Sequence, residues 1–333
     1  MELIIWLIFF AVSVAALLIG AAWFSAGAAR FLGKGQGDRP PAIAIGAALP
    51  ELALALAAAL SGRPELVLPI IVGSSIANIL LVAGVCAAAA KDLPIAKECA
   101  RDDASFLALA AVLLLFSAAD GVIVFWEGLM MIAAFFICVI YLFFYDRPRR
   151  FTPRDIIAPA MFGGSSRIAE NVGARFSRGF GRKAKNIPAA LLLGLFGALL
   201  LAIAADLAIE SLAGMASLLP IGAAALSFSV LAAATALPEI QGSLRVIAQK
   251  RYELALGNVF LAVAATVLPA AGICAMISPL PVGRETAAIG LPFFAASAVL
   301  LTVSGFSRKI NFGQGWLYLL LYSLFLAKLF NLF

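Results

Sequence analysis

Apolar runs of about 20 residues recur along the whole chain, and they constrain its fold more than any other feature. The first run, LIIWLIFFAVSVAALLIGAAWF, covers residues 3–24 and contains no charged side chain. A helix of about 20 apolar residues is long enough to cross the hydrocarbon core of a bilayer. The runs are continuous rather than alternating in polarity, so a β-barrel is not expected. We therefore predict an all-α polytopic membrane protein.

The composition agrees with this prediction. The 333 residues are 64% hydrophobic and 13% charged, with a mean hydropathy of +1.06, whereas a soluble domain carries roughly 25% charged residues. The first run is too long for the core of a signal peptide, and it follows Glu2 rather than a basic segment. We expect it to be a retained first helix.

Breaks at charged residues, glycine and proline predict ten membrane spans, five on each side of a long polar segment at about 146–186. The predicted spans lie near 2–24, 41–60, 65–88, 103–118, 121–145, 187–208, 218–247, 253–277, 286–304 and 316–333. This division predicts a first five-helix repeat at 1–145, a basic linker at 146–186 and a second five-helix repeat at 187–333.

The Lys and Arg residues lie mostly on one side of the predicted membrane. The segments after the first, third, fifth, seventh and ninth spans hold 21 of the 24. The other side has only Arg63, Arg284 and Lys328. Because basic loops stay in the cytoplasm, we expect the linker to be cytoplasmic and both termini to face outward, in a membrane of the bacterial inner-membrane type. The ten basic residues of the linker are expected to fix topology and attract anionic lipid headgroups.

The two halves match each other without gaps at an offset of 188 residues. Leu-Pro-Glu at 49–51 recurs at 237–239, and Ala-Gly-x-Cys-Ala at 83–87 recurs at 271–275. Such matches indicate an internal duplication, whose repeat motifs we place at 44–84 and 232–272. An odd number of spans in each half turns the second half upside down relative to the first. Inverted repeats of this kind are an architecture of secondary transporters.

The duplicated Leu-Pro-Glu places one carboxylate near the middle of a span in each half, at Glu51 and Glu239. An ionised carboxylate at that depth costs several kcal/mol unless it is paired or bound to a cation. The predicted spans contain no Lys or Arg at comparable depth. The pair is therefore expected to hold either a proton or a divalent cation. Pro50 and Pro238 each remove a helical hydrogen bond, which frees carbonyl oxygens as further ligands.

Other site chemistries have less support. The chain has no histidine, and its four cysteines show no Cys-x-x-Cys spacing. Asp206 and Glu210, which an intramembrane enzyme could use, fall near the end of the span predicted at 187–208. We expect neither an enzyme nor a resident cofactor, and no nucleic-acid partner.

At these residues the sequence resembles the cation/calcium exchanger superfamily, the family of sodium/calcium exchangers. The motifs that carry the resemblance are GAALPEL, GSSIAN, ATALPEI and LGNVF, and the likeness covers nearly the whole chain. It implies ten helices in two inverted halves. It also implies that Glu51 and Glu239 grip a divalent metal ion together with Asn78. The further cation-ligand positions that it implies are Ser74, Thr235 and Thr266.

The sequence departs from the family pattern at several expected ligands. A Thr-Ser pair is expected before each Pro-Glu, but the first half has Ala47-Ala48 and the second has Thr235-Ala236. Pro69-Ile70 replaces the expected Gly-Asn, and Ala262 replaces an expected serine. A complete set of sodium sites is therefore not expected, although one divalent cation could still be held.

These observations predict a secondary active antiporter that exchanges a cation, with Ca²⁺ as the leading candidate, for Na⁺ or H⁺ by alternating access. Two alternatives stay open. One is a divergent relative that moves another cation, and the other is a membrane protein whose ion site has degenerated and no longer transports. The sequence alone does not choose the coupling ion.

Overall fold

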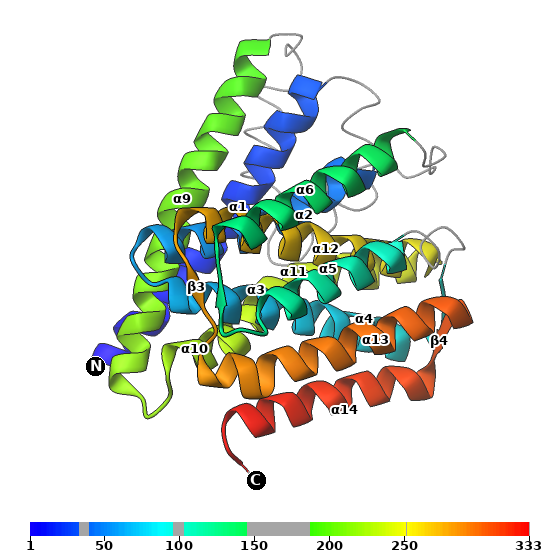
Figure 1. Ribbon diagram of the computed structural model, residues 1–333. Coiled ribbons are helices and arrows are strands. Elements are labelled where there is room, and N and C mark those ends of the chain that lie inside the picture. The colour runs from blue at the N-terminus through cyan, green and yellow to red at the C-terminus, as the bar shows by residue number, and fades with distance from the viewer. Residues whose placement is uncertain (33–39, 96–102, 145–186, 251, 333) are drawn as a thin grey trace.

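The structure is a computed structural model that describes residues 1–32, 40–95, 103–144, 187–250 and 252–332. Within these ranges the chain forms ten helical segments, as the apolar runs predicted (Figure 1). The predicted linker at 146–186 lies outside the described residues.

Each half of the chain contributes five of these segments. In the first half they are α1 (Glu2–Leu32), α2 (Pro40–Leu60), the run of η1 (Pro64–Leu66), α3 (Val67–Ile76), η2 (Ala77–Val82) and α4 (Ala83–Ala90), then α5 (Ala104–Ser117) and α6 (Phe125–Phe144). In the second half they are α9 (Ile187–Leu218), the run of α10 (Ala223–Leu226), η4 (Ser227–Leu231) and α11 (Ala232–Ala248), α12 (Tyr252–Ile277), the run of η5 (Thr286–Gly290) and α13 (Leu291–Ser307), and α14 (Phe312–Leu329).

Six of the described helices are long and apolar enough to cross a membrane, and three shorter helices are also apolar. The chain is an integral membrane protein. Two predicted boundaries were wrong, because α1 continues to Leu32 rather than ending near residue 24, and α9 continues to Leu218 rather than ending near residue 208. Asp206 and Glu210 therefore lie inside a helix and not at its end. The residues that follow them, LAGMASL, contain no proline and carry enough helix formers to continue the helix.

Two short strand pairs join the halves of the molecule, and they are copies of each other. Strand β1 (Asp92–Pro94) pairs antiparallel with β4 (Lys309–Asn311), and β2 (Val122–Ile123) pairs antiparallel with β3 (Leu280–Pro281). The partners Leu93 and Ile310 of the first pair correspond, at the offset of 188 residues, to Pro281 and Val122, which are partners in the second. The repeat inferred from Leu-Pro-Glu thus extends to the register of the backbone hydrogen bonds.

Glycine residues at which two helices cross closely, here called glycine crossings, follow the same repeat. A Cβ atom added at Gly84 in α4 would lie 3.2 Å from the carbonyl oxygen of Gly315 in α14. A Cβ atom at its counterpart Gly272 in α12 would lie 2.9 Å from the carbonyl oxygen of Gly128 in α6. Small residues let membrane helices approach closely, so van der Waals contact and not a hydrophobic driving force holds them together.

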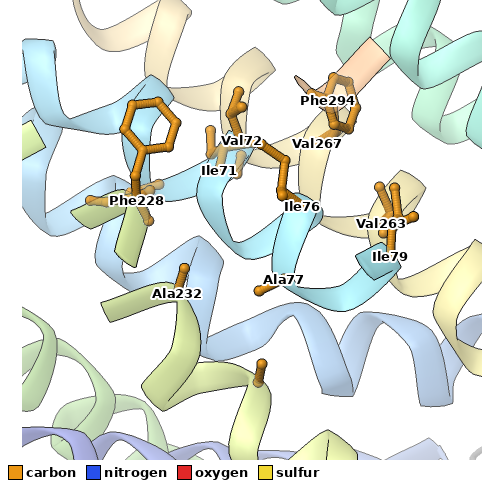
Figure 2. Close-up of a cluster of buried hydrophobic side chains, with 14 of the residues drawn as sticks. Ile71, Val72, Ile76, Ala77, Ile79, Phe228, Ala232, Val263, Val267 and Phe294 are labelled. Carbon is orange, nitrogen blue, oxygen red and sulfur yellow. The ribbon is translucent and has the colours of Figure 1, made fainter. Parts of the chain in front are cut away.

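The core is centred on α3, η2 and α12, whose side chains are almost all buried. Figure 2 shows Ile71 and Ile76 of this region beside Val267 of α12, with Phe228 of η4 nearby. The site helices α2 and α11 both pack against this core. The core therefore fixes their positions.

Helices α1 and α9 lie side by side along one flank of the molecule (Figure 1). Glycines form their contact: a Cβ atom added at Gly27 would lie 2.6 Å from the Gly194 nitrogen, and one at Gly20 would lie 2.8 Å from the Leu201 nitrogen. Large apolar side chains of the same helices, such as Phe196, are exposed. Two helices that pack on each other and face lipid require small residues at their contact and large apolar residues on their exposed sides.

Candidate functional site

The two carboxylates of the repeated Leu-Pro-Glu lie close together. Glu51 is on α2 and Glu239 is on α11, and each follows a proline that lies inside its helix. The two carboxyl groups are near enough for their charges to repel each other. The hydroxyl of Thr235, one turn before Glu239, lies within hydrogen-bonding reach of the Glu51 carboxyl. The inverted repeat thus brings these three sequence-predicted residues to one place.

The carboxylates differ in their surroundings. Glu51 is 2% exposed, whereas Glu239 is partly exposed. Both lie in helices whose other residues near them are mostly apolar or small. A pair of negative charges in such surroundings is unfavourable unless protons or a cation neutralise them.

Ser74 and Asn78 approach from the third helical segment. Ser74 is on α3 and Asn78 is on η2, a π-helical turn, and both side chains are buried. Elements α3 and η2 pack against α11, and α3 also packs against α2. Turns of π-helix inside α-helices are rare and are frequent at functional sites. Both residues therefore lie on the elements that surround the carboxylate pair.

The hydroxyl groups near the site donate their protons to their own helices. Ser74 Oγ donates to the carbonyl oxygen of Ile71 at 3.1 Å, and Thr235 Oγ1 donates to that of Ala232 at 3.2 Å. A hydroxyl has one proton and two acceptor lone pairs. With its proton used in the helix, the lone pairs of Ser74 remain available to a cation, whereas Thr235 can donate its one proton either to the Ala232 carbonyl or to the Glu51 carboxylate.

Two buried acceptor atoms of the site have no hydrogen-bond partner among the described residues. They are Glu51 Oε2 and Asn78 Oδ1. A buried acceptor left without a partner costs about 1–3 kcal/mol, and more if it is charged. A carboxylate oxygen and an amide oxygen are both hard ligands of the type that Ca²⁺ takes. A cation bound between them would satisfy both atoms at once.

Comparison with known proteins identifies the family of this chain. The family model described as sodium/calcium exchanger protein matches residues 5–144 and 189–331. The chain belongs to the sodium/calcium exchanger family. A curated relative in this comparison is the inner membrane protein YrbG of Escherichia coli (strain K12), 23% identical over 237 residues, which are 71% of this chain and 68% of YrbG. This is a family of cation transporters and not of enzymes.

Solved structures of the sodium-calcium exchanger NCX_Mj have the same fold. A structure soaked with Na⁺ and Sr²⁺ matches with a TM-score of 0.60 and 20% identity, covering 98% of this chain and 99% of the other. A second, soaked with Na⁺ and zero Ca²⁺, matches with a TM-score of 0.59 and 22% identity over 98% and 99%. At this identity the likeness concerns the fold, so the ion ligands must be argued from this chain.

Where this chain departs from the exchanger pattern, alanine methyl groups are packed in the interior. Ala48 is buried in a cluster with Leu261 and Ala265 of α12. Ala236 and Ala262 are also buried. These positions offer no side-chain oxygen to a cation. Thr266, the remaining residue predicted at the site, is buried on α12, which packs against both α2 and η2.

No third acidic side chain is grouped with Glu51 and Glu239 among the described residues. Among the residues that the structure describes, no three His, Cys, Asp or Glu side chains are grouped closely enough to hold a metal ion. A cation at this place would therefore need neutral oxygens to complete its shell. Asn78, the two hydroxyls and carbonyl groups freed by Pro50 and Pro238 are the candidates.

Sequence reasoning missed two polar neighbours of Glu239. The Cys86 thiol of α4 lies within hydrogen-bonding reach of the Ser243 hydroxyl of α11. It also interacts electrostatically with the Glu239 carboxylate. Ser243 could have been found, because it follows Glu239 by four residues and so lies on the same helix face. Cys86 gave no such signal, since its apolar neighbours favoured a packed thiol.

Proposed function

We propose that this exchanger is a secondary active antiporter that moves Ca²⁺ against Na⁺ or H⁺ by alternating access. The observation that supports the proposal most directly is that two buried acceptors, Glu51 Oε2 and Asn78 Oδ1, have no partner among the described residues, while Glu51 lies close to Glu239. Two carboxylates and one amide oxygen match the charge and the ligand type of one divalent cation.

The proposed site consists of Glu51, Glu239 and Asn78 as ligands of the divalent cation. Ser74, Thr235 and Thr266 are proposed as further cation ligands. Protons and the divalent cation compete for the same two carboxylates, so coupling to protons needs no additional site. The alanines at 48, 236 and 262 leave fewer oxygens for sodium, which makes the proton the better-supported coupling ion.

The proposed orientation follows from the distribution of basic residues. With the positive-inside rule, both termini face outward and the linker at 146–186 lies in the cytoplasm, where its ten basic residues attract anionic headgroups. Fluorescent labelling of single cysteines introduced at Ser61 and Gln249 in sealed cells tests this orientation. Only the cysteine at position 61 should react with an impermeant reagent.

The decisive experiment is ⁴⁵Ca²⁺ uptake into proteoliposomes under separately imposed sodium and proton gradients. Uptake should follow the proton gradient and should be lost in the Glu51→Gln, Glu239→Gln double variant. Uptake unchanged in that variant would remove the carboxylates from the mechanism. Uptake of manganese or magnesium but not calcium would favour a different transported cation. Absence of both binding and transport would favour a degenerate site.

A further inference from the structure

The helices around the carboxylate pair carry little other charge. Helix α2 and the run from α3 to α4 contain one charged residue between them, Glu51. Helix α11 contains Glu239 and Arg245, and Arg245 is exposed in the last turn, about 9 Å further along the helix axis. The one charged residue of α12 is Glu253, in its first turn. Within these described helices, no charge other than the two carboxylates lies at the depth of the site.

The other candidate ligands of the site are neutral. Asn78 and its repeat counterpart Thr266 are both buried, and so are Ser74 and Thr235. An amide or a hydroxyl supplies an oxygen to a cation but no negative charge. Among the described residues, no three His, Cys, Asp or Glu side chains are grouped closely enough to hold a metal ion. With both carboxylates ionised, the site therefore carries two negative charges, and its other candidate ligands add none.

Two negative charges limit which cations can occupy the site while it changes sides. Net charge in apolar surroundings is unfavourable, because little water is present to solvate it. One divalent cation neutralises the pair, and so do two monovalent cations. A third monovalent cation would leave one positive charge, and an empty site keeps both negative charges. The states that cross most easily are therefore the two neutral ones.

The supply of oxygen ligands agrees with this charge count. Ala48 precedes Glu51 by three residues and Ala236 precedes Glu239 by three, so each lies on the same helix face as its carboxylate. Both alanines are buried, at 3% and 1% exposed. Their methyl groups offer no oxygen to a cation. A third monovalent cation would therefore lack a compensating charge and would also lack side-chain ligands at these two positions.

We propose that each transport cycle exchanges one divalent cation for two monovalent cations, H⁺ or Na⁺, so that no net charge crosses the membrane. The proposal rests on the proposed function for the place of the transport site, and it adds the number of counter-ions and insensitivity to membrane potential. The charges balance, because one divalent cation leaves the two carboxylates as two monovalent cations take its place. Since the empty site keeps two negative charges, exchange is obligatory, and neither cation crosses without the other returning.

Proteoliposomes of the full-length chain test the electrical part of the proposal. Valinomycin and a potassium gradient of either direction impose a membrane potential, and ⁴⁵Ca²⁺ accumulation at equilibrium should be the same with and without it. If one net charge moved per cycle, a potassium gradient of about tenfold would change the accumulation by about tenfold. Thr266→Asp adds a third negative charge on α12 and should make accumulation depend on the potential. Thr266→Asn, the neutral matched variant, should stay insensitive to the potential.

The number of counter-ions is measured in the same vesicles, with a proton gradient in one arm and a sodium gradient in the other. In the arm that supplies the counter-ion, a gradient of about tenfold should support an accumulation of calcium of about 100-fold, because a two-for-one exchange depends on the square of that gradient. Accumulation of about tenfold or about 1,000-fold would overturn the two-for-one exchange.

The two proposals fail in different ways. Calcium accumulation that follows the potassium potential in the unaltered chain would overturn electroneutral exchange and leave calcium exchange itself in place. Absence of calcium uptake by the unaltered chain would instead remove the proposed function, and this proposal with it. Thermal unfolding shows whether the Thr266 variants are folded, and the measurements on the unaltered chain decide the proposal even where a variant is not.

Discussion

Helices α2 and α11 carry the same Leu-Pro-Glu at equivalent positions, yet they present it differently. Glu51 is almost wholly buried, and its helix continues with leucine and alanine only. Glu239 is partly exposed, and its helix continues with a glutamine and a serine. The two copies of the repeat thus share Leu-Pro-Glu, but the residues that follow it differ.

This difference indicates that the two halves contribute differently to cation binding and to exchange with solvent. A carboxylate in dry surroundings interacts strongly with a bound cation, because little water screens its charge. A carboxylate beside polar, partly exposed neighbours exchanges its proton or cation with solvent more easily. We infer that α2 supplies strength of binding and that α11 supplies access.

The largest effects are expected from single Glu→Gln variants of the pair. Glu51→Gln should weaken calcium binding by about 100-fold, because losing one member of a desolvated charged contact costs about 3 kcal/mol. Glu239→Gln should weaken it less, because Glu239 is partly exposed as a residue whereas Glu51 is almost wholly buried. Calcium titration by isothermal calorimetry measures both.

Exposed Glu65 provides the control for these variants, and Glu65→Gln should leave calcium binding unchanged. The same titrations at lower pH should show weaker calcium binding, because protons compete for both carboxylates. A larger loss of calcium affinity in Glu239→Gln than in Glu51→Gln would contradict the inference that α2 supplies strength of binding and α11 supplies access.

Much of this architecture could be predicted from the sequence. Ten spans and an internal duplication followed from apolar runs and from matches at one offset. The meeting of Glu51 and Glu239 followed from their equivalent depths in inverted halves. These features depend on hydropathy and symmetry, which a single sequence records.

Features that depend on helix–helix contacts could not be predicted from the sequence. The length of α9 was underestimated because Asp206 and Glu210 resembled a span end. The π-turn at η2 has no composition signal of its own, so it could not be foreseen. Such details arise from packing between segments far apart in the chain.

The glycine crossings allow a test of whether the two halves are equally tight. Gly128→Ala should destabilise the protein by about 1–3 kcal/mol, because the added Cβ would lie 2.6 Å from the Gly272 carbonyl oxygen. Gly315→Ala, at the other crossing, should cost a similar amount, since its Cβ would lie 2.8 Å from the Ala87 Cβ. Thermal unfolding in detergent measures both free energies. Gly313→Ala is the control, because nothing lies within 4 Å of its added Cβ.

An exchange of the residues at positions 78 and 266 tests the polar ligands of each half. Asn78→Thr should weaken calcium binding by about tenfold, since losing one polar contact of this kind costs about 1 kcal/mol or slightly more. Thr266→Asn should strengthen binding by a similar factor, because the longer amide brings an oxygen closer to the carboxylates. Calcium titration of both variants and of the double exchange checks this. Stronger binding in Asn78→Thr would contradict a role for the amide oxygen.

The smallest effect is expected at a link that only one half of the molecule has. Ser61, at the end of α2, donates its hydroxyl proton to Asp206 Oδ1 of α9 at 2.8 Å. The link is exposed, so Ser61→Ala and Asp206→Asn should each lower the free energy of unfolding by less than about 1 kcal/mol. The counterpart variant Gln249→Ala should change nothing, because the repeat position of Asp206 is Leu18, whose side chain has no acceptor atom. If either variant of the link instead alters calcium uptake in proteoliposomes without changing thermal unfolding, the link restrains movement of α9 against α2 and contributes to exchange rather than to stability.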